Sequence, residues 1–486
     1  MPTKAPVETV IRLRWRDVYH EVELYKAAVR VYTKPLFHWR KALGVSADGK
    51  TLYELAARGL RGLDAIHNAL AHEVFQFRPA VGLKYNFNGK QRTLYIPPWE
   101  ERIVDLMLYR VLNHRLHRWF SPSSYAYRDQ TYGLDSCQAR IRAHLRSSST
   151  SLYLVKRDIA DYFGSVDHEI LLRQLAELVE PHDYLFRLLQ QRIRFEYQDE
   201  TGMHQAHVGI PFGCASACLF ANIYLTCLDR AIAQIPNVHY FRYADDLLLL
   251  SSDRERAVLA RNRLYERLND LRLRTKPSHE ADLRFSPVTS DDQIFKSVRE
   301  FRHLGLLFKR GGGVSLSKDK RRKIQNLFRF AFRRKRRTWK RIKDPKERAR
   351  TLAAIALETI EDGVRNVAII DYYLKHVTDA VQLRSLDRWL AEEVLSLAFG
   401  GHKKGHFAKL SFETLRSLGL PSLIHRQKLI IHGYIRSPFF LWKEQKTRRA
   451  FRGTVASLVG SVAEDQASLR AQKQQLTTPV REGGCL

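Results

Sequence analysis

Two adjacent aspartates, Asp245 and Asp246, interrupt what would otherwise be a continuous apolar stretch of the chain. The segment His239-Tyr240-Phe241 precedes them, and Leu247-Leu248-Leu249-Leu250 follows them. Carboxylates set among apolar strands cost free energy unless another charge compensates them. The pattern therefore predicts a strand–turn–strand hairpin that carries the aspartate pair at its tip.

A third aspartate, Asp158, follows another apolar run, Leu152-Tyr153-Leu154-Val155. If this strand ends beside the hairpin tip, the three carboxylates converge and repel one another unless cations lie between them. Two Mg²⁺ ions about 3.5–4 Å apart, with Mn²⁺ as an alternative, would neutralise them and stabilise an in-line phosphoryl displacement. The residues alone leave a second reading open, in which Asp245-Asp246 is an ordinary polar turn and Asp158 caps a helix.

Positive charge is concentrated in one segment. The 486 residues contain 82 Lys and Arg against 51 Asp and Glu, a formal charge of +31, and residues 318–350 alone hold 17 Lys and Arg against three acids. Apolar residues recur at helical spacing there, which predicts a helix that buries one face and presents a basic one: Ile324, Leu327, Phe328, Ala331 and Phe332. A solvated charged helix is the alternative. We expect the basic face to bind nucleic acid phosphates through six arginines: Arg321, Arg322, Arg333, Arg334, Arg336 and Arg337.

Two further features restrict the class of protein. No stretch approaches the ~20 apolar residues of a membrane span, so we expect no membrane partner. The five cysteines include no pair in a Cys-x-x-Cys motif. This usage fits a reducing cytoplasm and disfavours a structural zinc site.

Asp158 and the aspartate pair belong to a series of six motifs between about residues 80 and 310. In chain order the motifs are Arg92–Pro97, Phe120–Arg128, Asp158–Phe163, Gly209–Ser216, Tyr243–Asp246 and Phe301–Gly305. The series resembles the motifs of reverse transcriptases, in particular the group II intron-like bacterial enzymes, and Tyr243-Ala244-Asp245-Asp246 resembles their YxDD box.

This resemblance implies an α+β protein with the right-hand polymerase fold of fingers, palm with an antiparallel sheet, and helical thumb. We expect an N-terminal helical extension over residues 1–75, fingers and palm over 76–310, a basic helical thumb over 314–375, a C-terminal helical domain over 376–452 and a mobile tail over 453–486. Within the palm, Phe301–Arg310 is expected to be one strand that ends at Gly311-Gly312-Gly313.

The resemblance also implies roles for the site residues. Asp158, Asp245 and Asp246 match the catalytic carboxylates, and Ile159 joins them in the expected metal-binding set. Lys276, in the loop after the box, is a candidate for the family lysine that protonates pyrophosphate.

Five residues match positions that contact the incoming dNTP. Arg92 matches a residue that binds the triphosphate, where a guanidinium can bind bidentately. Phe163 matches a bulky aromatic that would clash with a 2′-hydroxyl and so select dNTP over NTP. Gly213 would let backbone approach the nascent base pair, because it has no Cβ. Phe212 stands where intron-encoded members usually carry glutamine, and Tyr243 opens the box.

The predicted activity is RNA-directed DNA polymerisation from a partner non-coding RNA, with dNTPs and an RNA–DNA heteroduplex as ligands and the cytoplasm as location. No endonuclease or RNase H motif follows, which resembles the "unknown-group" prokaryotic enzymes, many of which act in antiphage defence. Alternatives are a diversity-generating or group II intron-type reverse transcriptase, or an RNA-binding maturase that no longer polymerises. The sequence is compatible with a homo-oligomer.

Overall fold

The computed structural model describes residues 12–35, 41–42, 44–87, 90–128, 131–148, 151–286, 292–361, 367–403 and 405–434. Within these ranges the chain forms two compact units, the first from residues up to Gly133 and Leu154–Ala281, the second from Leu134–Tyr153 and residues from Asp282 onward. Both units combine helices with antiparallel strand pairs, so the predicted α+β class is confirmed. The predicted domain boundaries remain predictions.

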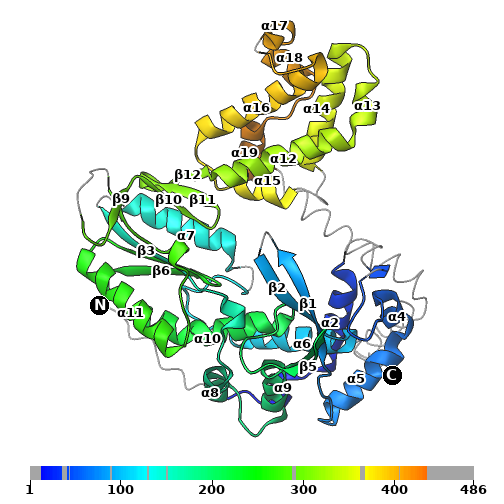
Figure 1. Cartoon of the computed structure of the whole chain (residues 1–486), viewed down its shortest axis with the longest axis vertical. Helices are drawn as coiled ribbons and strands as arrows, with labels where there is room; N and C mark the ends of the chain where they lie inside the picture. Colours follow the sequence, from blue (N-terminus) through cyan, green and yellow to red (C-terminus); the bar gives the residue numbers. More distant parts are fainter. Residues whose placement is uncertain are drawn as a thin grey trace, which may run out of the picture. The chain divides into compact units, whose positions relative to one another are not determined.

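The first unit begins with short helices and then alternates strands and helices (Figure 1). Its helices are α1 (Trp15–Val18), α2 (Glu21–Thr33), α4 (Leu52–Ala57), α5 (Gly59–Ala71), α6 (Trp99–Arg115), α8 (His168–Leu178), α9 (Tyr184–Ile193), α10 (Ala215–Ala233) and α11 (Arg254–Asp270), with 3-10 turns η1 (Tyr162–Gly164) and η2 (Pro277–His279). Its strands are β1 (Ala80–Phe87), β2 (Lys90–Ile96), β3 (Leu152–Asp158, which enters from the second unit), β4 (Glu196–Asp199), β5 (Gly202–Gln205), β6 (Val238–Tyr243) and β7 (Asp246–Ser251).

Two sheets organise this unit. Strands β1 and β2 form an antiparallel hairpin and continue through β4 to β5, in the order β2-β1-β4-β5. Strands β6, β7 and β3 lie side by side in that order. Helix α10 packs against α6, α8, α11 and β6 and is buried around most of its circumference, as expected of a helix that is apolar on all sides. It forms the core that supports the strands of the candidate site.

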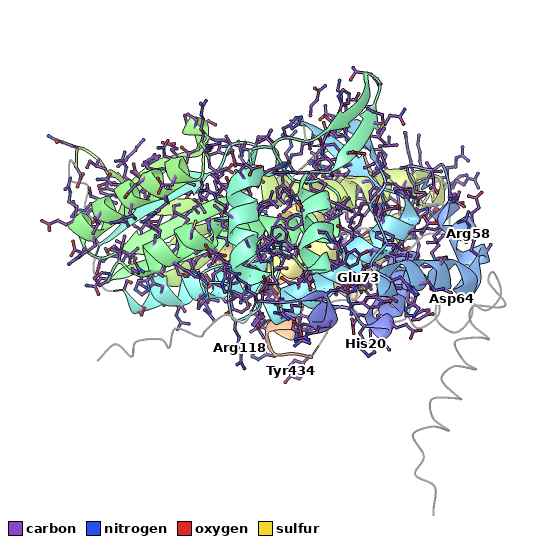
Figure 2. All side chains as sticks on the ribbon, turned by 90° about the horizontal axis from the view of Figure 1, so that it is seen from below. His20, Arg58, Asp64, Glu73, Arg118 and Tyr434 are labelled. Carbon is purple, nitrogen blue, oxygen red and sulfur yellow. The ribbon has the colours of Figure 1, made fainter. Side chains whose placement is uncertain are left out.

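The N-terminal helices cover this unit with polar side chains. His20, Arg58, Asp64 and Glu73 are exposed on the surface of this unit (Figure 2). Beneath them Leu24 and Leu52 are completely buried.

The second unit is helical, with short strands at its start. Its helices are α7 (Leu134–Ser147), α12 (Lys318–Arg334), α13 (Arg336–Lys340), α14 (Pro345–Glu361), α15 (Val367–Leu374), α16 (Ala380–Phe399), α17 (His406–Lys409), α18 (Phe412–Ser417) and α19 (Leu423–Ile431). Its strands are β8 (Ala281–Phe285, which begins in the first unit), β9 (Lys296–Val298), β10 (Glu300–His303), β11 (Leu306–Lys309) and β12 (Gly313–Leu316), the last two separated by η3 (Arg310–Gly312).

The single strand expected over Phe301–Arg310 is wrong. Strands β10 and β11 pair antiparallel there, joined by a turn at Leu304-Gly305 in which both residues have positive φ, 47° and 82°. An apolar run in the sequence does not reveal a two-residue turn when the first residue of that turn is a leucine. Gly311-Gly312-Gly313 leads from this hairpin into β12 within the second unit.

The basic helix is confirmed as α12, because Ile324, Phe328 and Phe332 are buried on one face, which packs against α14 and α16. In the described parts of the chain, no helix combines the length and apolarity that crossing a bilayer would require. The tail expected at 453–486 and residues 88–89 lie outside the described residues.

Candidate active site

The aspartate pair lies on the predicted hairpin. Tyr243 at the end of β6 pairs with Asp246 at the start of β7, which leaves Ala244 and Asp245 as a two-residue turn. Ala244 has a φ of 55°, a left-handed conformation that costs a non-glycine residue about 1 kcal/mol or more. The turn is therefore held in place by its surroundings and not by its own backbone preference.

Asp158 is the last residue of β3 and lies beside this turn. The backbone N–H of the buried Ile159 donates a hydrogen bond to the carbonyl of Asp245 at 3.2 Å. On the other side, the N–H of Lys276 donates to the carbonyl of Asp158 at 2.8 Å. The structure thus brings Asp158 and Asp245 together, as the sequence predicted, and adds a third segment that follows α11.

That third segment supplies two hydrogen-bonding side chains to Asp158, Lys276 and His279. The Lys276 Nζ lies 3.0 Å from both carboxylate oxygens of Asp158, and His279 Nδ1 lies 2.6 Å from its Oδ2. Burial alone would raise the pKa of Asp158, but the hydrogen bonds from His279 and Lys276 outweigh it and hold the pKa below its usual value. Asp158 is therefore ionised at neutral pH.

The pKa of Asp245 is shifted in the opposite direction. Burial, followed by the charge of Asp158, raises the pKa of Asp245 to about 6. Burial also raises the pKa of Asp246. A divalent cation would relieve both effects by neutralising the carboxylates, so these residues fit the expected metal. Over the described residues, no three His, Cys, Asp or Glu side chains already form a metal cage.

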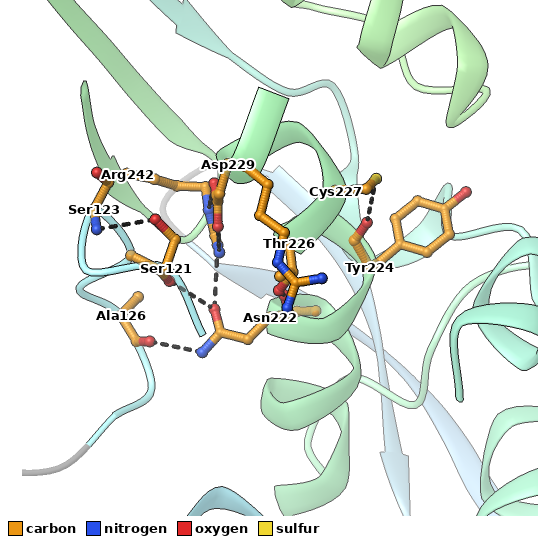
Figure 3. A network of polar contacts seen from close by, with 12 residues as sticks. Ser121, Ser123, Ala126, Asn222, Tyr224, Thr226, Cys227, Asp229 and Arg242 are labelled. Carbon is orange, nitrogen blue, oxygen red and sulfur yellow. Dashed lines mark hydrogen bonds and ion pairs between the residues drawn. The ribbon is translucent and has the colours of Figure 1, made fainter. Parts of the chain in front are cut away.

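A buried ion pair supports the turn from behind (Figure 3). Arg242, completely buried, donates to both carboxylate oxygens of Asp229 at 2.7 and 2.6 Å, and to the Asn222 Oδ1 at 3.1 Å. It also reaches the Ala244 carbonyl at 3.5 Å. Asp229 and Asn222 belong to α10, so this network ties the β6–β7 turn to the core helix.

Sequence reasoning assigned no role to Arg242, Asp229 or His279. Arg242 carried a signal, because a single charge inside the apolar run of β6 requires a buried partner. His279 carried none, since nothing in the sequence shows that a residue 121 positions from Asp158 returns to it.

Three of the five residues expected to contact the dNTP lie against one another: Arg92, Phe212 and Phe163. The Arg92 guanidinium lies 5.3 Å from the centre of the Phe212 ring, and Phe212 contacts Phe163 edge-on at 5.6 Å. Phe163 also contacts Tyr127 edge-on at 6.2 Å. Tyr243 is half-buried at the end of β6.

Gly213 is required by the neighbouring strand. It has a φ of 111°, and a Cβ there would lie 2.5 Å from the Leu94 Cδ1 and 3.1 Å from the Tyr95 carbonyl of β2. The close neighbour of Gly213 in the structure is therefore the β1–β2 hairpin, which also carries Arg92. The arginines expected to bind nucleic acid lie on α12 and α13 of the second unit; Arg321 is half-buried, and the others are exposed: Arg322, Arg333, Arg334, Arg336 and Arg337.

The site lies within a recognisable sequence family. Residues 82–306 match the family described as "Reverse transcriptase (RNA-dependent DNA polymerase)". The chain is 25% identical over 191 residues to the retron Ec83 reverse transcriptase of Escherichia coli, covering 37% of this chain and 56% of that protein. It is 25% identical over 146 residues to the group II intron-encoded protein LtrA of Lactococcus lactis subsp. cremoris, covering 30% of this chain and 24% of that protein.

Among solved structures, telomerase from Candida albicans in complex with a fragment of telomeric RNA aligns with a TM-score of 0.42 at 11% identity, over 71% of this chain and 64% of that one. The chain spans about half or less of the length of the curated relatives named here. The matched region contains Asp158, Asp245, Asp246 and the residues around them. Residues 82–306 are thus a reverse transcriptase domain, and its relatives are of the retron and group II intron types.

Proposed function

We propose that the protein is an RNA-directed DNA polymerase that copies a partner non-coding RNA into DNA by nucleotidyl transfer. One observation carries the proposal: within the matched region, Asp158 and Asp245 meet at the end of β3 and the β6–β7 turn. Two carboxylates held together against their mutual repulsion are a site built for cations.

Different residues of the site would have different roles in the reaction. Asp158, Asp245 and Asp246, with Ile159 beside them, would hold two Mg²⁺ ions, or Mn²⁺, which supply charge neutralisation and Lewis-acid polarisation when bound. Arg92, exposed on the β1–β2 hairpin, is suited to bind the triphosphate.

Phe163 is fixed by two edge-on rings, Phe212 and Tyr127, and so is suited to reject a 2′-hydroxyl by shape. Attack of the primer 3′-hydroxyl on the α-phosphate forms the new phosphodiester bond, and pyrophosphate leaves. The Lys276 Nζ, already beside Asp158, is positioned to donate a proton to that leaving group.

The partners follow from the same proposal. The template is an RNA, the product complex is an RNA–DNA heteroduplex bound by the basic face of α12, and the substrates are dNTPs. We propose a dedicated non-coding RNA as the template and antiphage defence in the cytoplasm as the setting; the likeness to the retron Ec83 reverse transcriptase is consistent with this proposal. A group II intron-type or diversity-generating enzyme, or a non-polymerising maturase, is the competing function, and the LtrA relative favours the intron type among these.

The first test is primer extension on poly(rA)/oligo(dT) with Mg²⁺. We expect wild type and Glu200→Gln, an exposed carboxylate of the same unit, to incorporate dTTP, and the pair Asp245→Ala plus Asp246→Ala to lose incorporation while still binding RNA. Incorporation by the double variant would overturn the metal site, and none by wild type would favour the maturase.

The second test identifies the template. Nucleic acid that co-purifies from cells carrying the native locus is sequenced for wild type and for the double variant, with RNA and DNA recorded separately. One abundant RNA in both samples, with complementary DNA only in wild type, is the expected result. Intron RNA, or paired template and variable repeats, would instead identify the competing enzyme types.

A further inference from the structure

Two cavities of the second unit meet on helix α16. One, of about 590 Å³, lies between α12 and α16, and the other, of about 870 Å³, lies between α16 and the α17–α19 region. Arg388 and Glu392 line both cavities. The two cavities are thus neighbours that share these two residues of α16, and we call the pair the α16 hollow.

The charge of the α16 hollow is positive and largely uncompensated. Eight Lys and Arg side chains line it, against Asp387 and Glu392. Asp387 is buried and accepts hydrogen bonds from Arg416 Nη2 at 3.0 Å, Ser422 Oγ at 2.8 Å and Leu423 N at 2.7 Å, while Arg388 binds Glu392 at 3.0 Å.

Five of the lining cations have no carboxylate partner among the residues that the structure describes: Lys318, Arg321, Arg322, Arg384 and Lys403. These five cations repel one another without a carboxylate beside them, so a polyanion is the ligand that their charge favours.

Flat apolar faces lie between these cations. Trp389, Phe407 and Phe412 are half-buried in the lining, and the guanidinium of Arg329 lies 5.2 Å from the Trp389 ring centre. Arg416 lies 4.6 Å from the Phe412 ring centre. Cationic grooves with half-exposed rings are the surfaces on which unpaired bases stack while the phosphates are neutralised.

Of the six arginines expected to bind nucleic acid, Arg321 and Arg322 line the hollow, whereas four do not: Arg333, Arg334, Arg336 and Arg337. The residues that α12 contributes to the hollow, Lys318–Arg329 at helical spacing, flank the buried stripe. A second exposed stripe, which includes Asn326, Phe330 and Arg333, lies roughly a quarter of a turn further around the helix. One basic helix thus contributes to two surfaces, the first of which borders a cavity that α12 shares with α16.

We infer that the α16 hollow binds a single-stranded segment of RNA, separate from the template–primer duplex. The inference deepens the proposed function, on which it rests for the choice of RNA as the polyanion. The bases of a duplex are stacked inside it and are not available to rings such as Trp389 and Phe412, whereas an unpaired segment exposes both its bases and its phosphates. The segment is therefore an unpaired part of the partner RNA that anchors it to the C-terminal helices.

The test compares two charge-matched pairs of variants in the full-length protein. Arg384→Gln plus Lys403→Gln removes two cations of the hollow; Lys340→Gln plus Lys346→Gln removes two exposed cations of α13 and α14 that do not line it. Fluorescence anisotropy measures binding of a labelled single-stranded RNA of about 20 nucleotides, long enough to fill one such groove, and of a blunt RNA–DNA heteroduplex of equal length, each over a salt series.

We expect the hollow pair to weaken single-strand binding by roughly tenfold and to lower the slope of log K against log salt by about 1.4, two phosphates at 0.7 each. Heteroduplex binding should change less than about threefold, as should both ligands in the control pair. Phe412→Ala should weaken single-strand binding by roughly tenfold with an unchanged salt slope, because it removes stacking and no charge. Circular dichroism establishes that each variant is folded.

Equal loss of single-strand and heteroduplex binding in the hollow pair, or equal loss in the control pair, would overturn the inference. Crosslinking of 4-thiouridine RNA to wild type gives a test without mutation: peptides from 384–416 should carry the crosslink, and crosslinks confined to 326–337 would contradict it. Neither measurement needs nucleotide incorporation. If wild type fails primer extension and these results hold, the proposed polymerase function falls while the RNA site stands.

Discussion

Replacing Asp245 by asparagine should stabilise the metal-free protein. Burial and the charge of Asp158 raise the pKa of Asp245 from its ordinary 3.8 to about 6, so at neutral pH the folded chain holds a carboxylate charge that it disfavours. A shift of about two units corresponds to about 3 kcal/mol, and because the site opens to solvent we expect about 1–3 kcal/mol of stabilisation at pH 7. An amide keeps the shape of the side chain and removes the charge.

The dependence on pH has a defined sign. Since the folded pKa lies above the unfolded one, the folded state binds more protons, and wild type loses stability relative to Asp245→Asn as the pH rises from about 4 to about 6. Above about pH 6.5 the difference should stay constant. Asp158, with its lowered pKa, acts in the opposite direction only at more acidic pH.

Urea unfolding in EDTA from pH 5 to 8 measures this difference, with Glu200→Gln as the control for loss of an exposed carboxylate. In a second series, added Mg²⁺ should raise the melting temperature of wild type and of Glu200→Gln, because it binds the folded state, and leave Asp245→Asn nearly unchanged. If Asp245→Asn is no more stable than wild type in EDTA, or gains equally from Mg²⁺, the carboxylate repulsion inferred from the structure is refuted.

Three further outcomes follow from the site. Phe163→Ala should reduce the preference for dNTP over NTP by roughly a hundredfold in single-nucleotide incorporation, whereas Phe163→Tyr should retain it, and equal preference in the alanine variant and wild type would remove the steric gate. Arg242→Met should lower the free energy of unfolding, measured in urea, by about 3–5 kcal/mol, because it leaves Asp229 buried without a partner. An effect below about 1 kcal/mol would show that the ion pair does not stabilise the turn. His279→Ala removes a hydrogen bond that lowers the pKa of Asp158, so the acidic limb of the kcat/KM profile should move to higher pH, and an unmoved limb would contradict that contact.

The local parts of the site could be predicted from the sequence because they depend on short-range patterns. The apolar runs on both sides of Asp245-Asp246 predict the hairpin, and the spacing of Ile324, Phe328 and Phe332 predicts the buried face of α12; both are confirmed. The two-residue turn at Leu304-Gly305 escaped prediction because leucine rarely adopts positive φ.

Contacts between segments that are distant in the sequence could not be predicted in this way. His279 reaches Asp158, and Arg242 reaches Asp229 on α10, only through the tertiary fold. The α16 hollow likewise combines α12, α16 and the α17–α19 region, whose side chains show no common pattern along the chain. Burial and charge, both properties of the folded state, decide what these residues do.

Three departures from ordinary folding preferences fall within the four residues Arg242–Asp245. Arg242 is a completely buried charge, Ala244 adopts a positive φ, and Asp245 is a carboxylate with a raised pKa. The first is compensated by Asp229, and the second is held by the contact of Arg242 with the Ala244 carbonyl. The third is not compensated by any described contact that lowers the pKa to its ordinary value, since burial and the neighbouring Asp158 outweigh Lys276. Two of these three local costs are thus compensated within the protein, and the third is not. The negative charge of Asp245 lies where a bound cation would neutralise it, and this uncompensated charge is the physical reason for proposing the chemistry at this turn.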